Sequence, residues 1–388
     1  MKKIGLIIAN PITNYGAHLQ GYATQVAIDS LGAKTAVFDV SRVRGRAFVD
    51  FGLFIKAFGV ILRRLFKKKQ TQNYDDLFRQ NVKERTQLAK DFRNRRLHDV
   101  VVYTDYAKLV NDAKSYDTIM IGSDQMWPPG ASFGSILSLR FVPKGVKRVS
   151  YATSLGVSEY PKYCWNSARD MWTKIDYVSV REEQGANIIR KVCRNKVDVK
   201  VVVDPTYLMT KEQWENVIPV QKMCEKKYVF CYFLGDDINS KLCAKRYAEK
   251  NNLHLVSILS SESYSEIDRT FADDTVSAAT PEEFINWVRG AECVFTDSFH
   301  GLAFSVINHK QFFVFYRKRR DSKQSRNSRI DNILSMWDCE DRLVVDPTMD
   351  WTNKDIVPID YSHVESLITE KRNESLDYLK KAIGINEN

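Results

Sequence analysis

In the second half of the chain an apolar run, Cys293-Val294-Phe295, passes directly into the polar stretch Thr296-Asp297-Ser298-Phe299-His300-Gly301. The apolar run is typical of a buried strand, and residues 302–307 are typical of a short helix. His300 is therefore predicted at a strand-to-helix turn, where the free N–H groups of a helix start attract anions. A histidine there can also transfer protons near neutral pH. The alternative is a histidine that only packs or caps the turn, but the stretch supplies more polar groups than one cap requires.

The length and composition of the chain favour two soluble domains. It has 388 residues, of which 44% are hydrophobic, and it lacks an 18-residue apolar run. The apolar residues after Met1-Lys2-Lys3 are too few for a signal peptide and end at Asn10-Pro11, so they predict a first strand. The seven cysteines form no CxxC pair or metal-ligand cluster, which indicates reduced cysteines, a cytoplasmic protein and no metal site.

The charge of the chain indicates anionic partners. Its formal net charge is +10 and its sequence pI is about 9.1. Nucleic acid, a lipid surface and phosphorylated small molecules all fit such a balance. Nucleic acid is the least expected of the three, because the sequence carries no zinc finger and no aromatic RNA-binding signature.

The start of the chain has a βαβ pattern. Residues 3–9 predict a strand, 16–31 a helix and 35–40 a second strand. This order favours a parallel sheet with right-handed crossovers. The loop 14–20 would lie at the carboxyl end of the first strand, where such sheets bind ligands, although the dinucleotide fingerprint GxGxxG is missing. A plain turn and helix cap is the alternative.

The same alternation continues to about residue 345 and predicts two α/β domains. Further strands are predicted at 117–121, 148–152, 177–180, 199–203, 228–234, 253–259 and 311–315. Thr280-Pro281-Glu282-Glu283 predicts a helix start, with Thr280 as N-cap and Glu283 closing a capping box. We expect domains at 1–205 and 206–345, and a C-terminal segment at 346–388 whose residues 364–383 form an amphipathic helix.

A helical, basic insertion is expected at about 42–96 in the first domain. Within it the apolar run 51–62 leads into a basic cluster that ends at Lys69. The apolar run is too short to span a bilayer but suits the surface of an anionic membrane. The alternative is an insertion packed on the domain, with a solvated charge run.

Polar residues follow the predicted strand 117–121. Gly122-Ser123-Asp124-Gln125-Met126-Trp127 suits a carbohydrate or phosphate ligand at a strand's carboxyl end. The alternative is an ordinary polar loop with Trp127 packed inward.

Arginines follow two other strands. Arg181 opposes the dipole of the helix that it precedes, which suits a residue that holds an anion. Pairing of Arg181 with Glu182 or Asp204 is the structural alternative. The basic run 316–320 and the nearby Arg329 belong to the same domain as His300, so they are either further anion-binding residues or a solvated loop.

Five motifs in this order resemble those of the polysaccharide pyruvyl transferase family. The resemblance spans about residues 4 to 340, and no single motif carries it. The motifs are Asn14-Tyr15-Gly16-Ala17 with Leu19-Gln20 and Tyr22-Ala23, Gly122-Ser123-Asp124-Gln125-x-Trp127, Ser179-x-Arg181-Glu182-Glu183, Asp204-Pro205-Thr206, and Asp297-Ser298-Phe299-His300-Gly301 with Phe304-Ser305.

The resemblance implies a glycosyltransferase-B-like fold, with two Rossmann-like domains facing a cleft and a C-terminal helix. It implies transfer of pyruvate from phosphoenolpyruvate, as a co-substrate and without a cofactor or metal, onto a sugar or lipid-linked oligosaccharide in exopolysaccharide biosynthesis. The product would be a ketal. Independently of the resemblance, the cysteines and the segment 51–69 predict a cytoplasmic protein with possible peripheral contact to the inner face of the membrane.

The resemblance also implies roles for particular residues. The family's histidine falls on His300 and its Ser-x-Arg arginine on Arg181, which makes these two the expected catalytic residues. The donor would be held by Arg181, Ser298, His300, Gly301, Lys318, Arg319 and Arg329, with the choice among the last three left open. The acceptor would contact Asn14, Tyr15, Gly16, Gln20, Ser123, Asp124, Gln125 and Trp127, with Trp127 as a stacking surface.

Two other functions fit parts of the pattern. A nucleotide-sugar glycosyltransferase of the same architecture would bind UDP or GDP instead of phosphoenolpyruvate. A non-catalytic membrane-docking assembly protein would have kept the fold without the reaction, although the presence of both Arg181 and His300 argues against this.

Overall fold

The computed structural model describes residues 1–9, 13–43, 76–134, 136–263, 265–317, 327–349 and 357–385. The segment Phe51–Lys69, for which membrane contact is predicted, lies outside these residues, as do Lys318 and Arg319. Those predictions stay untested. No helix of the described ranges is both long enough and apolar enough to cross a bilayer.

The first half of the chain forms a parallel sheet, as predicted. Its strand order is β3-β2-β1-β4-β5, and every pair is parallel. Single bridges at Val149–Tyr177 and Thr153–Val180 bring a second parallel pair, β6 with β7, alongside β5. The strands are β1 (Lys3–Ile7), β2 (Lys34–Asp39), β3 (Val100–Val102), β4 (Thr118–Ile121), β5 (Lys147–Ser150), β6 (Val178–Val180) and β7 (Val199–Val201).

The second half repeats the design. Its strand order is β10-β9-β8-β11-β12-β13, again all parallel. These strands are β8 (Tyr228–Tyr232), β9 (His254–Ile258), β10 (Asp274–Val276), β11 (Cys293–Thr296), β12 (Gln311–Phe315) and β13 (Leu343–Val344). The predicted glycosyltransferase-B-like class, two parallel α/β units and a final helix, is confirmed by this topology. The boundaries predicted for the domains stay a prediction.

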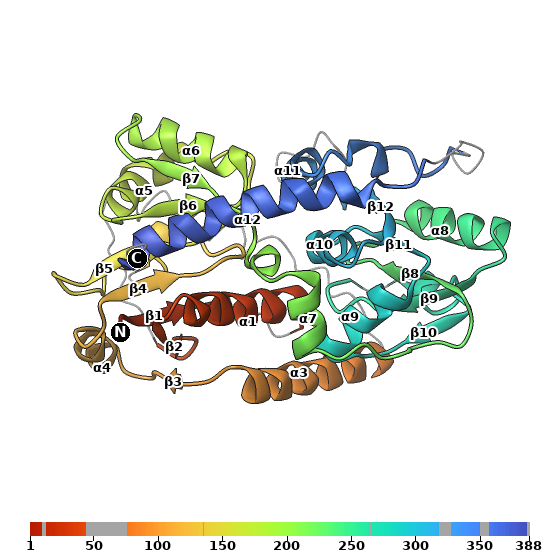
Figure 1. Ribbon diagram of the computed structural model, residues 1–388, viewed down its shortest axis with the longest axis horizontal. Helices are drawn as coiled ribbons and strands as arrows, with labels where there is room; N and C mark the ends of the chain where they lie inside the picture. Colours follow the sequence, from red (N-terminus) through yellow and green to blue (C-terminus); the bar gives the residue numbers. More distant parts are fainter. Residues whose placement is uncertain are drawn as a thin grey trace.

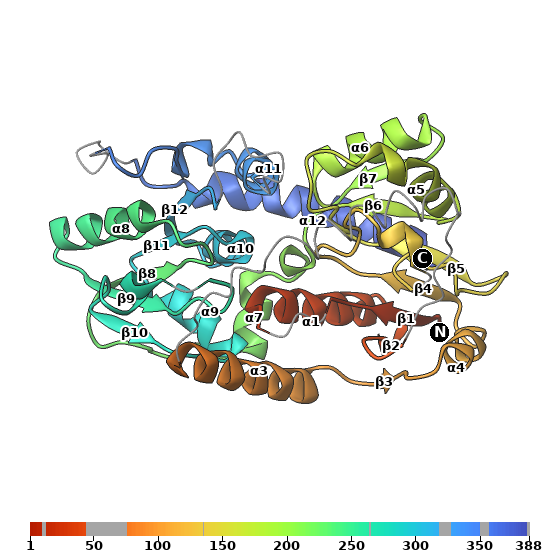
Figure 2. The same cartoon turned by 180° about the vertical axis from the view of Figure 1, so that it is seen from behind.

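Helices cover the two sheets and cross between them (Figures 1 and 2). The predicted capping box is present at the start of α9, with Thr280 as its N-cap. The α-helices are α1 (Tyr15–Ser30), α3 (Asp76–Arg96), α4 (Tyr106–Ala113), α5 (Trp165–Trp172), α6 (Glu183–Cys193), α7 (Lys211–Val217), α8 (Ile238–Lys250), α9 (Pro281–Gly290), α10 (Phe299–Ile307), α11 (Ser328–Met336) and α12 (Tyr361–Ile383).

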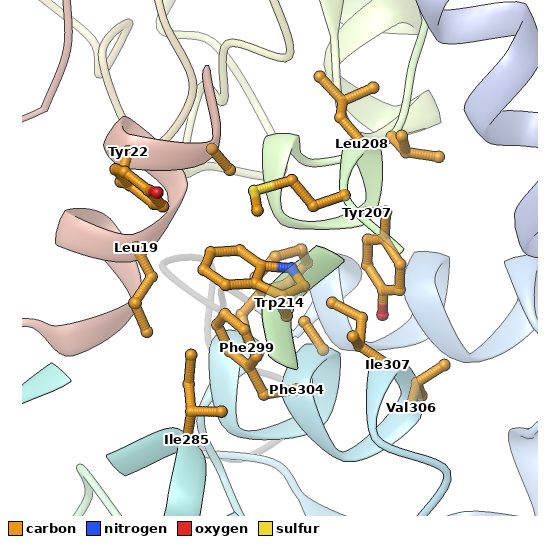
Figure 3. Close-up of a cluster of buried hydrophobic side chains, with 14 of the residues drawn as sticks. Leu19, Tyr22, Tyr207, Leu208, Trp214, Ile285, Phe299, Phe304, Val306 and Ile307 are labelled. Carbon is orange, nitrogen blue, oxygen red and sulfur yellow. The ribbon is translucent and has the colours of Figure 1, made fainter. Parts of the chain in front are cut away.

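An apolar core joins the two halves of the chain (Figure 3). At its centre Trp214 of α7 is fully buried, with its ring 6.1 Å from that of Tyr22 on α1 and 5.2 Å from that of Phe304 on α10. Its indole N–H donates to the Thr206 carbonyl oxygen at 3.0 Å. Replacing a buried tryptophan by alanine typically lowers the free energy of unfolding by about 3–5 kcal/mol. Because Trp214 contacts side chains of both halves, this core holds the first half against the second.

The last helix, α12, runs along both halves (Figure 1). Near its start the Tyr361 hydroxyl donates to the Lys310 carbonyl oxygen in the second half. Further on, the Ser375 hydroxyl accepts from the Val203 N–H at 3.0 Å, and the Tyr378 hydroxyl donates to the Ser150 carbonyl oxygen at 2.8 Å. The helix therefore ties the second half to the carboxyl end of β5 in the first.

Candidate active site

A cavity of about 340 Å³ lies where the carboxyl ends of the two sheets meet. Parallel sheets bind ligands at this edge because their strands end there in loops and helix starts. Both halves of the chain contribute to its walls. The lining residues are Ala9, Asn14, Asp124, Gln125, Met126, Leu234, Glu262, Ser298, Phe299, His300, Arg317 and Arg329.

His300 stands on the first turn of α10, directly after β11, as its sequence context predicts. Ser298 is the N-cap, and its hydroxyl accepts from the Gly301 N–H at 3.4 Å. The imidazole is buried, yet its Nε2 has no hydrogen-bond partner among the described residues. His300 also lines the cavity, but Nε2 itself has almost no exposed surface and lies 3.9 Å from Asp204 Oδ2.

Gly16 of α1 makes room for the imidazole. A Cβ atom built on Gly16 would lie 1.9 Å from Cγ of His300 and 2.1 Å from its Nδ1. A residue with a side chain would not fit at this position. The backbone of Gly16 in the first half of the chain therefore packs directly against the imidazole of His300 in the second half. The role of Gly16 is thus to admit His300, which spacing in the sequence could not indicate.

The surroundings of His300 keep its imidazole neutral at pH 7. Burial lowers the pKa of His300 to about 4, and Arg181 and Arg329 add to the lowering. Asp204 and Asp124 act in the opposite direction but do not overcome the burial. Negative charge brought into the cavity would therefore favour the imidazolium.

Asp204 connects the groups around His300. Its buried carboxylate accepts from Arg181 Nη1 at 2.7 Å, from the Ser123 hydroxyl at 3.0 Å and from the Thr206 hydroxyl at 2.9 Å. Oδ2 lies 3.9 Å from His300 Nε2, too far for a hydrogen bond. Burial alone would raise the pKa of Asp204, but protonated His300, Arg181 and the Thr206 N–H hold it below its usual value.

Arg181 lies behind the cavity. Its guanidinium is 1% exposed and pairs with Asp204, with Glu182 at 3.1 Å and with Asp124 at 3.5 Å. It also lies over the ring of Phe299, 4.3 Å from the ring centre, next to His300. The structural alternative, pairing with neighbouring carboxylates, thus describes its placement, and nothing tests the predicted contact with a donor.

Two other arginines do line the cavity. Arg317 pairs with Glu262 at 3.0 Å and approaches Asp297 at 3.9 Å. Arg329 forms no ion pair within 4 Å in the described ranges, and its buried Nε has no hydrogen-bond partner there. Burial lowers the pKa of Arg329 to about 10, with Arg181 adding to the effect, so Arg329 remains a cation at pH 7.

The helix that carries Arg329, α11, was not predicted. Asn332, one turn further along it, donates to the Arg181 carbonyl oxygen at 3.2 Å and accepts from the Glu183 N–H at 3.1 Å. α11 therefore attaches the second half to the loop that carries Arg181.

The structure brings some of the predicted site residues to the cavity and places others behind it. Those on its walls are Asn14, Asp124, Gln125, Ser298, His300 and Arg329. Those absent from its described lining are Tyr15, Gly16, Gln20, Ser123, Trp127, Arg181 and Gly301. Asp204, Glu262 and Arg317 are site residues that the predictions did not single out, although Asp204 stood in a motif and Arg317 in the basic run.

Trp127 does not provide the expected stacking surface. It is fully buried, its indole N–H donates to the Leu137 carbonyl oxygen at 3.0 Å, and its ring packs 6.1 Å from that of Trp172. Tyr15 is also buried, and its hydroxyl accepts from the Ala279 N–H at 3.0 Å. Both aromatic side chains pack in the core behind the cavity. Burying their large rings among apolar side chains is more favourable than exposing them to water at the cavity surface.

The described residues offer no group of three or more His, Cys, Asp or Glu side chains of the kind that holds a metal ion. All seven cysteines are free, and none lines the cavity described above.

A family model described as polysaccharide pyruvyl transferase matches residues 14–319, which is more than half of the chain. The match ends before Arg329. No curated protein sequence matches.

Several solved structures resemble the chain at low sequence identity. A putative UDP-N-acetylglucosamine 2-epimerase from Listeria monocytogenes is 11% identical, with 98% of this chain and 91% of that chain covered and a TM-score of 0.48. The UDP-GlcNAc 2-epimerase from Neisseria meningitidis bound to UDP-GlcNAc is 11% identical, with 100% and 95% covered and a TM-score of 0.45. An α-glucosyltransferase in complex with UDP is 9% identical, with 98% and 96% covered and a TM-score of 0.45.

Proposed function

Because the chain belongs to the polysaccharide pyruvyl transferase family, we propose that it transfers pyruvate from phosphoenolpyruvate to a sugar of a polysaccharide or its precursor. The product of this reaction is a ketal across two hydroxyls of the sugar, and inorganic phosphate is released.

The observation that carries the proposal is that His300 and Arg329 line the same cavity. Among the described residues, His300 Nε2 has no hydrogen-bond partner and Arg329 has no carboxylate within 4 Å, although the charges of Glu182 and Asp124 act on it. A partly buried cation without a close carboxylate is stabilised when an anion binds beside it. A small anion that must receive a proton suits both residues at once.

Phosphoenolpyruvate has the required chemistry. Its carboxylate and phosphate suit arginine, and we assign Arg329 to one of these groups. Arg317 is less available, because Glu262 and Asp297 already face its guanidinium. The N-terminal end of α10, where Ser298 and His300 stand, adds a favourable dipole for an anion.

Proton transfer to carbon 3 of the donor falls to His300. Burial keeps His300 neutral at pH 7, so the proton has to be gained when the donor binds. The donor's negative charges favour the imidazolium, and Asp204 stands 3.9 Å away as its counter-ion. A positioned general acid of this kind contributes about 10²–10⁴-fold in rate.

Arg181 supports this chemistry from behind the cavity. It holds Asp204, Glu182 and Asp124 around His300 and has no free face in the described cavity. We therefore assign it a positioning role and leave direct donor contact to Arg329. The acceptor side is formed by Asn14, Asp124 and Gln125, which come from the first half of the chain.

The test is incubation of the protein with phosphoenolpyruvate and candidate sugar acceptors, with phosphate release and the mass of the acceptor measured together. We expect equal amounts of phosphate and pyruvylated acceptor, and a loss of both with His300→Gln. Saturable binding of UDP or GDP without binding of phosphoenolpyruvate would refute the proposal in favour of a nucleotide-sugar glycosyltransferase.

A further inference from the structure

Ketal formation requires more than a proton donor. Each of the two acceptor hydroxyls loses a proton when its oxygen bonds to carbon 2, whereas carbon 3 gains only one proton. The other proton ends on the released phosphate, and a group on the acceptor side of the cavity that takes it first would make the hydroxyl a better nucleophile. This role rests on the proposed function, and the family match does not say which residue fills it.

Most carboxylates near the cavity are already engaged. Asp297 accepts from the N–H groups of Leu234 and Gly235, each at 2.7 Å. Glu262 pairs with Arg317 at 3.0 Å. Asp204 is 1% exposed and accepts from several donors at once.

Asp124 is the exception. It lines the cavity with a side chain that is 16% exposed, and in the described ranges its carboxylate pairs with Arg181 Nη2 at 3.5 Å. Asp124, His300 and Arg329 line the same cavity, and the charge of Asp124 acts on the other two groups. An oxygen of Asp124 can therefore meet an acceptor hydroxyl while Arg181 keeps the carboxylate in place.

The backbone at Asp124 is strained in a way that fits this role. Its φ is 74°, in the left-handed region that residues other than glycine rarely adopt. Its carbonyl oxygen accepts from the N–H groups of Met126 at 2.7 Å and Ser154 at 2.9 Å, which hold this conformation. A strained backbone of this kind costs about 1–3 kcal/mol and is found most often at functional sites, where the surrounding structure holds the side chain in one orientation.

We propose that Asp124 is the general base for the first acceptor hydroxyl. As that oxygen bonds to carbon 2, its proton passes to Asp124, and carbon 3 takes a proton from the imidazolium of His300. The carbon 2–oxygen bond to phosphate then breaks, with its electron pair leaving on the phosphate, which takes the proton from Asp124. The second hydroxyl bonds to carbon 2 and gives its proton to the neutral His300, so both residues return to their starting states.

The test uses two substitutions that keep the backbone. Asp124→Asn tolerates a positive φ but cannot accept the proton, and Asp124→Gly relieves the strain and leaves space for a small carboxylate. We expect transfer to fall about 10²–10⁴-fold in both variants. Phosphoenolpyruvate affinity should stay within a few-fold of wild type.

Added formate should restore transfer by Asp124→Gly but not by Asp124→Asn or His300→Gln, with chloride at equal ionic strength as the salt control. A residue that only supports the fold would not respond to formate. Near-normal turnover by Asp124→Asn, or a folded, donor-binding Asp124→Gly that formate leaves inactive, would overturn the role of Asp124 alone. A wild-type protein that binds no phosphoenolpyruvate would overturn the proposed function, and the role of Asp124 with it.

Discussion

Donor binding should load a proton onto His300, and the amount can be worked out from the site. Burial lowers the pKa of His300 to about 4, so at pH 7 on the order of one molecule in a thousand carries the imidazolium. One negative charge about 5 Å from the ring, at an effective dielectric constant of about 20, favours the imidazolium by about 3 kcal/mol. That corresponds to about 2 pKa units for each charge.

Phosphoenolpyruvate brings at least two negative charges to a cavity that holds Arg329. Two charges raise the pKa of His300 to roughly 8 by the same reasoning. About 0.9 proton should therefore be taken up per donor bound at pH 7, falling to about 0.1 at pH 9.

Titration calorimetry in buffers of different ionisation enthalpy measures this uptake. His300→Gln is the matched control, because proton changes on the donor itself are common to both proteins. The reasoning is refuted if both proteins bind the donor and their proton uptake at pH 7 differs by less than about 0.2.

Three further predictions concern residues of the same site. On acidification from pH 7 to pH 4, the unfolding free energy of wild type should fall by about 3 kcal/mol more than that of His300→Gln. Between these pH values the histidine takes up a proton in the unfolded chain but stays neutral in the folded protein, so acidification favours unfolding. Urea titrations at several pH values measure this fall in the free energy of unfolding. Gly16→Ala should lower the free energy of unfolding by about 1–3 kcal/mol and the rate of transfer at least tenfold, because the added Cβ would collide with His300. Gly21→Ala is the control and should lower the rate far less, because its added Cβ would meet only the flexible end of Ile8. Equal losses of rate in the two variants would contradict the close fit of Gly16 against His300. Arg329→Lys should keep the fold and weaken phosphoenolpyruvate binding at least tenfold in calorimetry, because lysine lacks the planar fork, and unchanged affinity would exclude Arg329 as the donor anchor.

The fold could be predicted from the sequence to a large extent because most of its strands are buried on both faces. Runs such as Tyr228–Tyr232 and Gln311–Phe315 are continuous and apolar, which is the pattern of a parallel sheet. The capping box predicted the start of α9 correctly, with Thr280 as its N-cap. The short edge strands β3, β10 and β13 were missed, because two or three residues carry too little pattern.

The site could be predicted only in part, because its geometry depends on contacts far apart in the chain. The Asp204 carboxylate accepts hydrogen bonds from Ser123 and Arg181, which lie 81 and 23 residues away in the sequence. No local sequence pattern shows which of these motifs faces the cavity and which lies behind it. Trp127 follows a polar loop, which suggested a surface residue, yet a cluster around Trp172 surrounds it. α11 was overlooked because the charged residues before it concealed the periodicity of Ile330, Ile333 and Leu334.

The course of α12 has a consequence for the order in which the protein becomes functional. Both sheets are synthesised before this helix, and domains generally fold in that order as the chain emerges. Until α12 is made, the Val203 N–H lacks the Ser375 hydroxyl and the Ser150 carbonyl lacks the Tyr378 hydroxyl. A nascent chain can thus hold both walls of the cavity and still lack the helix that fastens one to the other, so the capacity to bind donor should appear late in translation, with the docking of α12.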